Sequence, residues 1–295
     1  MRHSIGIDMG GTKIEGCIAD EKGKIIFRYR THTDADKGKT SVLKNILYVI
    51  DTLIGHNKGI KLSGIGIGIP GFTDKKGKVI FMPNVPLVGT NLKKSLEKKY
   101  RLKVSIDNDA NLFAYAEYLF GAGKNASSLL GLIVGTGVGG GIIIDGNIIH
   151  GSNGGAGEVG QQVIDKRAKK IHETKNTFNS FCSGPGIVRR YKEAGGKLIN
   201  PDPQDIFRSK GHPAIRVIDD EYNYLAMLLG SLTNTLSLDR IVLGGGVSND
   251  LDPKRLLRET RRFTIRSMAK TLKIKKNKLG DSSGVLGAAM LVFSQ

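Results

Sequence analysis

The chain has 295 residues and an ordinary apolar content, which suits one large folded domain or two of usual size and argues against disorder. Its two cysteines form no Cys-x-x-Cys pair, which excludes a cysteine-ligated zinc site and argues against a disulfide framework, and its net charge of +18 is high for an enzyme. Because no apolar run is long enough for a signal peptide or a membrane span, we expect a cytoplasmic protein without a membrane partner.

Three short strands are predicted at the start of the chain. Their apolar cores lie at 5–7, 14–18 and 25–27. Gly10-Gly11 separates the first pair and the letters EKGK separate the second, which favours an antiparallel meander. Apolar residues at helical spacing then predict a helix over 40–54, and the letters LSGIGIGI predict a buried strand that ends at Pro70-Gly71.

The opening pattern returns in the middle of the chain. Asn91 begins a predicted short helix, the letters KVSID predict a strand, and a helix follows over 110–120. Residues 129–151 then read again as strand, glycine turn, strand, Asp145-Gly146 turn and strand. Two such copies predict a duplicated α/β architecture with a cleft between the halves.

Helices are predicted over 170–181, 186–194 and 214–236, with a buried strand in the letters RIVLG after them. A small-residue helix in SSGVLGAAMLVF should fold back onto the first half. These elements predict two domains. The first spans 1–107 with 285–295, and the larger second spans 108–284.

The segment from Lys254 to Lys278 has eleven basic residues and a single acid, Glu259. Its apolar residues recur at roughly helical spacing, which predicts an amphipathic helix with a basic outer face. Such a face suits either a nucleic acid or another anionic partner, or simply solvent. We favour solvent, and expect no nucleic-acid partner, because no helix-turn-helix and no aromatic platform accompanies the patch.

Three junctions between a strand and glycines carry the strongest chemical signal. They are DMGGTK at 8–13, GTGVGGG at 135–141 and LGGGV at 243–247. Any one of them is as well explained by a tight hairpin, but three together favour backbone N–H groups that bind phosphate. None is a Walker A loop, and GTGVGGG precedes a strand instead of a helix, so it is not a dinucleotide fingerprint.

Acidic and amide residues follow the predicted strands. Asp8 could carry a hydrated Mg²⁺ that accompanies a nucleotide, or could shape an Asx-turn. The run Asp107-Asn108-Asp109 exceeds the need for one helix cap, and a spare carboxylate there could take a proton from a hydroxyl that attacks a γ-phosphate. Asn84 suits a sugar hydroxyl or a turn.

Glu158, in the letters GGAGEVG, is a further acidic residue with one functional and one structural interpretation. Its carboxylate could accept two hydrogen bonds from a polyol, or it could be a solvent-facing loop acid.

In this order the motifs resemble the ROK family of sugar kinases, which has a two-domain actin/hexokinase fold of the ribonuclease H-like type. The resemblance runs from Ile5 to the last helix and rests on DMGGTK, PG, PN, DNDAN, GTGVGGGI, GAGEVG, SGPGI and LGGGVS. It implies an ATP-dependent, magnesium-using kinase that phosphorylates a hexose hydroxyl, usually the 6-hydroxyl of glucose or a related sugar. It also implies a homo-oligomer, with a dimer the simplest case.

The resemblance assigns roles to particular residues. Asp109 is implied as the general base, and Asp8 as the Mg²⁺ contact through the nucleotide. The residues implied at the nucleotide are Asp8, Gly10, Gly11, Thr12, Lys13, Gly135, Thr136, Gly137, Gly245 and Gly246. Those implied at the sugar are Gly71, Asn84, Asn108, Asp109 and Glu158, together with the positions of Gln161 and Asn179.

Two of these positions depart from the family pattern. Gln161 stands where the family has a zinc-binding and sugar-contacting His, and the Cys-rich segment is missing, so we expect a zinc-free branch. Asn179 stands where an acid usually contacts the sugar, and Glu173 could substitute for it. The changes leave N-acetylmannosamine, N-acetylglucosamine and fructose open as substrates beside glucose. A non-catalytic sugar sensor is the alternative of another class, although it would have no need of a base at Asp109.

Overall fold

The computed structural model describes residues 1–57, 59–164, 170–171 and 174–294. They form two compact units. Unit 1 comprises 1–120, 150–156 and 279–295, and unit 2 comprises 121–149 and 157–278. The boundary predicted at 107/108 differs from this division, because the helix that follows Asn108 packs against the helix near residue 290 and groups with unit 1.

Unit 1 is built on a five-stranded sheet of order β3-β2-β1-β4-β7. Its strands are β1 His3–Met9, β2 Lys13–Asp20, β3 Ile25–His32, β4 Leu62–Ile69 and β7 Val104–Asn108. The first three form the predicted antiparallel meander, while β4 and β7 run parallel to β1. Its helices are α1 Lys39–His56, α2 Leu92–Tyr100, α3 Asp109–Phe120 and α10 Ser283–Leu291, and its smaller elements are η1 Ala35–Lys37, η5 Gly280–Ser282 and the hairpin of β5 Phe72–Thr73 and β6 Val79–Phe81.

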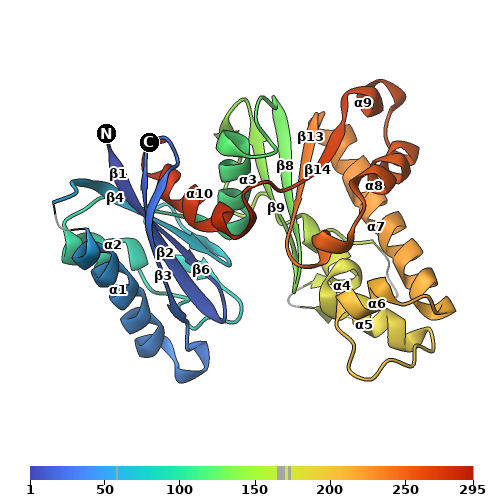
Figure 1. Cartoon of the computed structure of the whole chain (residues 1–295), viewed down its shortest axis with the longest axis horizontal. Helices are drawn as coiled ribbons and strands as arrows, with labels where there is room; N and C mark the ends of the chain where they lie inside the picture. The colour runs from blue at the N-terminus through green and yellow to red at the C-terminus, as the bar shows by residue number, and fades with distance from the viewer. Residues whose placement is uncertain (58, 165–169, 172–173, 295) are drawn as a thin grey trace. The chain divides into compact units, whose positions relative to one another are not determined.

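Helices α1 and α10 cover opposite faces of this sheet (Figure 1). On the α1 face, buried isoleucines of the strands pack against Val49, Leu53 and their neighbours. On the α10 face the strands carry small residues, so the helix backbone lies directly on the sheet. A Cβ built on Gly66 would stand 1.8 Å from the carbonyl oxygen of Ala288, and one on Gly6 would stand 2.0 Å from that of Val285.

Unit 2 repeats the plan with a sheet of order β10-β9-β8-β13-β14. Its strands are β8 Ser128–Val134, β9 Val138–Ile144, β10 Asn147–Ile148, β13 Arg240–Gly244 and β14 Lys273–Lys276. As in unit 1, three strands form an antiparallel meander and two run parallel to its first strand. The duplicated α/β architecture predicted from the sequence repeat is therefore confirmed.

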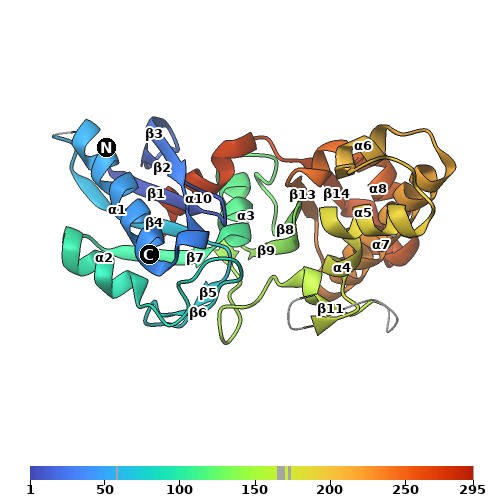
Figure 2. The ribbon, with the colours of Figure 1, turned by 90° about the horizontal axis from the view of Figure 1, so that it is seen from below.

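Four helices of unit 2 that follow β10 pack into one cluster. Figure 2 shows α4, α5, α6 and α7 together, and each of them contacts at least two of the others. The unit contains α4 Phe178–Cys182, α5 Gly184–Glu193, α6 Pro203–Arg208, α7 His212–Leu236, α8 Pro253–Thr260, α9 Arg266–Thr271, η2 Val159–Gln161, η3 Val247–Asp250, η4 Arg261–Phe263, and the two-stranded pair β11 Lys170–Ile171 and β12 Thr174–Lys175. No helix within the described ranges is both long and apolar enough to cross a bilayer.

Two predicted helices are wrong. The basic segment is not one helix but α8, η4, α9 and β14, because Ile274 is buried on a strand that pairs with β13 while its flanking lysines are exposed. The helix predicted from residue 170 begins only at Phe178. The Thr177 side chain accepts the Ser180 N–H there and Ser180 Oγ accepts the Thr177 N–H, which is a capping box that fixes the start.

Candidate functional site

The turn between β1 and β2 has a fixed shape. Gly10 donates its N–H to the Lys13 carbonyl over 2.9 Å. The buried Thr33 holds the other side, because its N–H donates to the Thr12 carbonyl (2.9 Å) and its hydroxyl to the Gly10 carbonyl (2.7 Å). A pocket of about 490 Å³ beside the turn is lined by Thr12, Lys13, Arg30, Thr31 and His32. Backbone turn and cationic lining together suit an anionic group.

Asp8 lies at the end of β1 in a space that two glycines leave open. A Cβ on Gly284 of α10 would stand 2.2 Å from its Oδ2, and one on Gly68 would stand 3.5 Å from its Oδ1. Burial raises the pKa of Asp8 to about 6, helped by the charge of Glu15 and opposed by Lys13 and Arg30. The carboxylate is therefore ionised at neutral pH but protonates in mildly acidic solution.

The carboxyl ends of β1, β4 and β7 gather several predicted residues. In the sheet register Asp8 is paired with Gly68, and Gly68 with Asp107. The chain leaves β4 at Gly71 and leaves β7 at Asn108, so the loops that follow both strands begin at this edge. Parallel strands of α/β proteins present ligand-binding residues at this end.

Asn108 links these two loops. Its Nδ2 donates to the Gly71 carbonyl over 3.1 Å, and its Oδ1 accepts the N–H of Ala110 over 2.8 Å. Asp107 accepts the Asn108 N–H (2.7 Å) and the Asn111 side-chain amide (2.8 Å) through Oδ1. Asp107 and Asn108 thus stabilise the start of α3, and Asn108 also fixes the loop that begins at Gly71. Asp109 is the first residue of α3, and its Oδ1 accepts the Ala110 N–H over 2.8 Å.

The loop that contains Asn84 lies against the β1–β2 turn. A Cβ on Gly11 would stand 3.8 Å from the Asn84 Cβ. The backbone of Asn84 is left-handed, with φ of 66°, a conformation that Asn tolerates better than most residues. Unit 1 therefore brings the first glycine turn, Asn84, Gly71 and Asn108 together near the carboxyl ends of β1, β4 and β7.

His150 is a residue of this region that the sequence analysis did not single out. Its Nε2 donates to Oδ2 of the buried Asp107 over 2.7 Å, and this hydrogen bond raises the pKa of His150 against the opposing effect of burial. The bond ties segment 150–156 to the end of β7. The letters NIIHG carry no pattern that indicates it, because the two partners are 43 residues apart in the chain.

The turn between β8 and β9 in unit 2 is also braced on both sides. Gly135 donates its N–H to the Gly137 carbonyl (2.9 Å) and accepts the Gly184 N–H at its own carbonyl (2.7 Å). The side chain of Asn179, only 4% exposed, accepts the Val138 N–H at Oδ1 over 2.8 Å. Asn179 is thereby placed as a support of the second glycine turn.

The third glycine segment meets the second. Gly245 has φ of 88°, and a Cβ there would stand 2.5 Å from the Val134 carbonyl oxygen, so only glycine fits this crossing of β8. The Gly246 N lies 3.7 Å from the Cβ position of Gly135. The two segments that the sequence assigned to the nucleotide are thus neighbours.

A pocket of about 750 Å³ opens beside them. Its lining combines glycines and Thr136 with apolar prolines and valines and with two cations. The lining residues are Gly135, Thr136, Gly184, Pro185, Val188, Arg189, Lys192, Pro201, Asp202, Pro203, Gln204, Gly246 and Val247. A largely apolar pocket whose lining includes glycine backbone and two cations suits a flat aromatic group joined to an anion.

Glu158 precedes the short helix η2 in unit 2, and Gln161 is the last residue of that helix. Both are partly exposed, and the Gln161 N–H donates to the Glu158 carbonyl over 3.0 Å. Gly160 lets η2 touch β9, since a Cβ on it would stand 2.0 Å from the Val138 carbonyl oxygen. The residues predicted for the sugar therefore fall into one set in unit 1 and another in unit 2, while Glu173 lies outside the described residues.

Both cysteines are buried thiols. Burial raises the pKa of Cys17 to about 12 and raises that of Cys182 well above its usual value. Among the residues that the structure describes, no three His, Cys, Asp or Glu side chains are grouped so as to hold a metal ion.

Comparison with known proteins places these features in a family. A family model described as "ROK family" matches residues 4–295. A glucokinase from Halalkalibacterium halodurans is 33% identical over 316 residues, which cover 100% of this chain and 96% of the relative. An N-acetyl-D-glucosamine kinase from Photobacterium profundum is 33% identical over 310 residues, which cover 97% of this chain and 98% of the relative.

Two solved structures of ROK family proteins are similar to this chain over nearly its whole length. A ROK hexokinase from Thermus thermophilus has a TM-score of 0.88 at 26% identity and covers 99% of this chain and 98% of its own. A ROK family glucokinase from Streptomyces griseus, solved with glucose and AMPPNP, has a TM-score of 0.83 at 26% identity and covers 99% and 100%.

Proposed function

The chain belongs to the ROK family, and we propose that it is an ATP-dependent sugar kinase that phosphorylates a hexose hydroxyl, with the 6-hydroxyl of glucose as first candidate. The observation that carries this proposal is the arrangement at the carboxyl ends of β1, β4 and β7. Asn108 is anchored there to Gly71, and the carboxylate of Asp109 stands at the start of α3. The relatives at 33% identity, a glucokinase and an N-acetyl-D-glucosamine kinase, support the same reaction class.

In the proposed reaction unit 2 binds the nucleoside of ATP. The pocket of about 750 Å³ has apolar lining residues for the adenine, and Thr136 and Gly246 in its lining would offer backbone N–H groups to the phosphates. Asn179 and Gly184 keep the β8–β9 turn in shape through the bonds to Val138 and Gly135. A turn that is already rigid loses little conformational entropy when phosphate binds.

Unit 1 supplies the groups that act on the sugar. Asn84 and Asn108 would bind its hydroxyls, and the Asp109 carboxylate would accept the proton of the attacking hydroxyl. As that oxygen bonds to the γ-phosphorus, the bond from the γ-phosphorus to the β,γ-bridging oxygen breaks and ADP leaves. The Gly10–Lys13 turn, with Arg30 nearby, would hold phosphate oxygens.

The residues present fit a magnesium ion at Asp8. The carboxylate stands in a space that Gly68 and Gly284 leave open, and a single carboxylate is a usual protein contribution to a nucleotide-bound Mg²⁺. When bound, the ion would neutralise charge on the phosphates. Because burial raises the pKa of Asp8 to about 6, protons would compete with the ion for this carboxylate in mildly acidic solution.

N-acetylglucosamine is the second candidate substrate, since a kinase of that sugar is as similar to this chain as the glucokinase is. The amide of Gln161 would replace the imidazole contact usual in the family. We also propose that the protein is cytoplasmic, where ATP is available, that it is a dimer, and that it holds no zinc. Light scattering would test the dimer, and elemental analysis that finds one zinc per chain would contradict the last point.

A coupled assay of ADP release across glucose, fructose, mannose, N-acetylglucosamine and N-acetylmannosamine tests the activity. We expect turnover of glucose or N-acetylglucosamine, and a fall of about 10²–10⁴-fold in kcat for Asp109→Asn. Asp145→Asn, in the β9–β10 turn, is a matched control that should change nothing. Absence of turnover on every sugar would favour a sugar sensor, and full activity of Asp109→Asn would refute the assignment of the base.

A further inference from the structure

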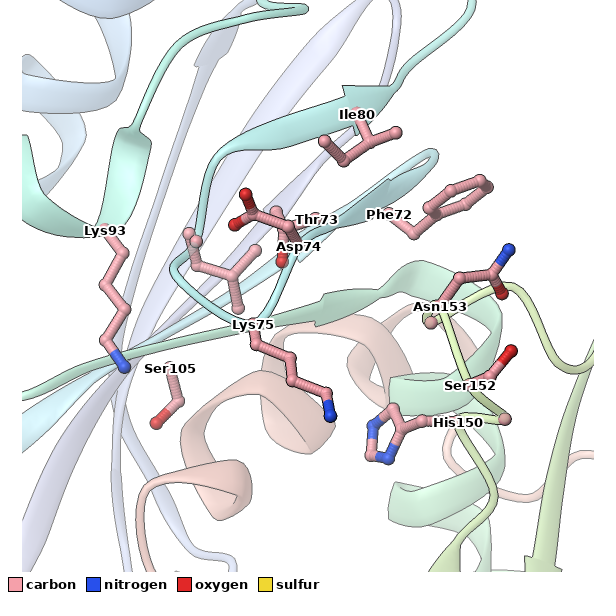
Figure 3. Close-up of a pocket in the computed structure, with 14 residues that line it drawn as sticks. Phe72, Thr73, Asp74, Lys75, Ile80, Lys93, Ser105, His150, Ser152 and Asn153 are labelled. Carbon is pink, nitrogen blue, oxygen red and sulfur yellow. The ribbon is translucent and has the colours of Figure 1, made fainter.

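Unit 1 contains a second pocket, of about 520 Å³, which the proposed reaction does not use (Figure 3). Its walls come from the β5–β6 hairpin, α2, β7 and residues 150–154. None of its described lining residues belongs to the sets assigned above to the nucleotide or the sugar. We propose that this pocket binds a small phosphate ester with a hydroxylated carbon skeleton, such as an alditol or sugar phosphate.

Two lysines contribute positive charge to the lining of the pocket. Figure 3 shows the ammonium end of Lys93 near Ser105 and that of Lys75 near His150. The carboxylate of Asp74 points away from both ammonium ends, and its Oδ1 accepts the N–H groups of Lys76 and Lys78, each over 2.9 Å. Asp74 is therefore committed to its own turn, and the two lysines can face a bound anion.

Lys93 is held in position before any ligand arrives. A Cβ on Gly77 would stand 2.3 Å from the Lys93 Cβ, so the stem of the lysine packs across that glycine. Lys93 is partly buried as a result, whereas the next residue, Lys94, is exposed. A cation whose stem is fixed loses less side-chain entropy on binding than one on an open surface.

The remaining walls fit a carbon skeleton with hydroxyls. Ser152 and Asn153 contribute polar side chains on the side opposite Lys93 (Figure 3). The Phe72 ring, stacked on Phe81 with 5.4 Å between centroids, offers an apolar wall against which C–H groups of a sugar can pack. The volume exceeds that of an inorganic phosphate and lies in the range of small-molecule sites.

The pocket also lies next to the residues of the proposed reaction. Phe72 directly follows Gly71, and His150 bonds to Asp107, whose other oxygen accepts the Asn108 N–H. The ligand class is nevertheless argued from the lining alone, so it does not depend on the proposed activity.

Isothermal titration calorimetry with glucitol 6-phosphate tests the proposal, with glucitol and inorganic phosphate as separate arms. The variant Lys75→Met/Lys93→Met removes the two pocket cations. Lys76→Met/Lys94→Met removes the same charge from the same turn and the same helix, outside the pocket lining. We expect the wild type to bind glucitol 6-phosphate more tightly than it binds glucitol or inorganic phosphate. The affinity for the ester should fall at least about tenfold in Lys75→Met/Lys93→Met and change little in Lys76→Met/Lys94→Met.

An equal loss of affinity for the ester in the two double variants would overturn the proposal. So would the absence of binding heat when the ester is titrated at millimolar concentration. Inorganic phosphate that binds as tightly as the ester would overturn the assignment of an ester. Melting curves of both variants would confirm that they fold. Turnover of glucose and ATP is measured separately on the wild type, so failure of the kinase proposal and failure of this one give different results.

Discussion

Replacing Asn179 by alanine would separate two roles for this side chain, a support of the β8–β9 turn and a contact to the sugar. Its Oδ1 accepts the Val138 N–H over 2.8 Å and also lies 3.2 Å from the Cβ position of Gly137. The alanine variant leaves that N–H buried without its acceptor, which costs about 1–3 kcal/mol. A chain of this size loses roughly 2–4 °C in Tm per kcal/mol.

The kinetic expectation follows from the same bond. Because the supported turn is the one proposed to hold ATP phosphates, Asn179→Ala should raise KM for ATP several-fold and leave KM for the sugar nearly unchanged. Steady-state kinetics with each substrate varied in turn would measure both values. Asn179→Asp keeps an oxygen acceptor for the Val138 N–H and should recover most of the ATP affinity. A large rise in KM for the sugar with KM for ATP unchanged would refute the reasoning.

Three further outcomes are expected. Gly66→Ala should cost about 3 kcal/mol or more in denaturant unfolding, since its Cβ would collide with the α10 backbone, whereas Gly55→Ala, with open space around it, should be nearly neutral. Glu221→Ala should cost about 3–5 kcal/mol, because it leaves the Arg190 guanidinium buried without its carboxylate partner, and an unchanged urea midpoint would contradict this. Kinase activity should fall as pH drops through about 6, where Asp8 protonates. Asp8→Asn should keep a small residual activity, and that activity should show no fall near pH 6.

The strands and glycine turns were predictable from the sequence because their signals are local. Apolar runs broken by Gly10-Gly11 or by Asp145-Gly146 need no distant partner to be read as hairpins, and both meanders are present. The repeat also predicted that the two halves share one plan, and both sheets have the same type of strand order. Asn91 as a helix start was equally local, since its Oδ1 accepts the Lys94 N–H over 2.9 Å.

The failures arise where tertiary pairing decides. Nothing within the basic segment indicates that Ile274 pairs with β13, because the register depends on a strand about 30 residues earlier. The bond between His150 and Asp107 is invisible for the same reason. At Asn179 family resemblance predicted a sugar contact, and that remains untested, while the bond to Val138 could be found only in three dimensions.

The packing of α10 has a consequence for the order of folding. Unit 1 begins with the first strands to be synthesised, yet Gly6 and Gly66 of its sheet lie against α10, a helix encoded after all of unit 2. Unit 2 can therefore complete its core while this part of the unit 1 sheet still lacks α10. About 160 further residues must be synthesised after α3 before α10 can pack on Gly6 and Gly66, so unit 1 completes its core only when the end of the chain has been made.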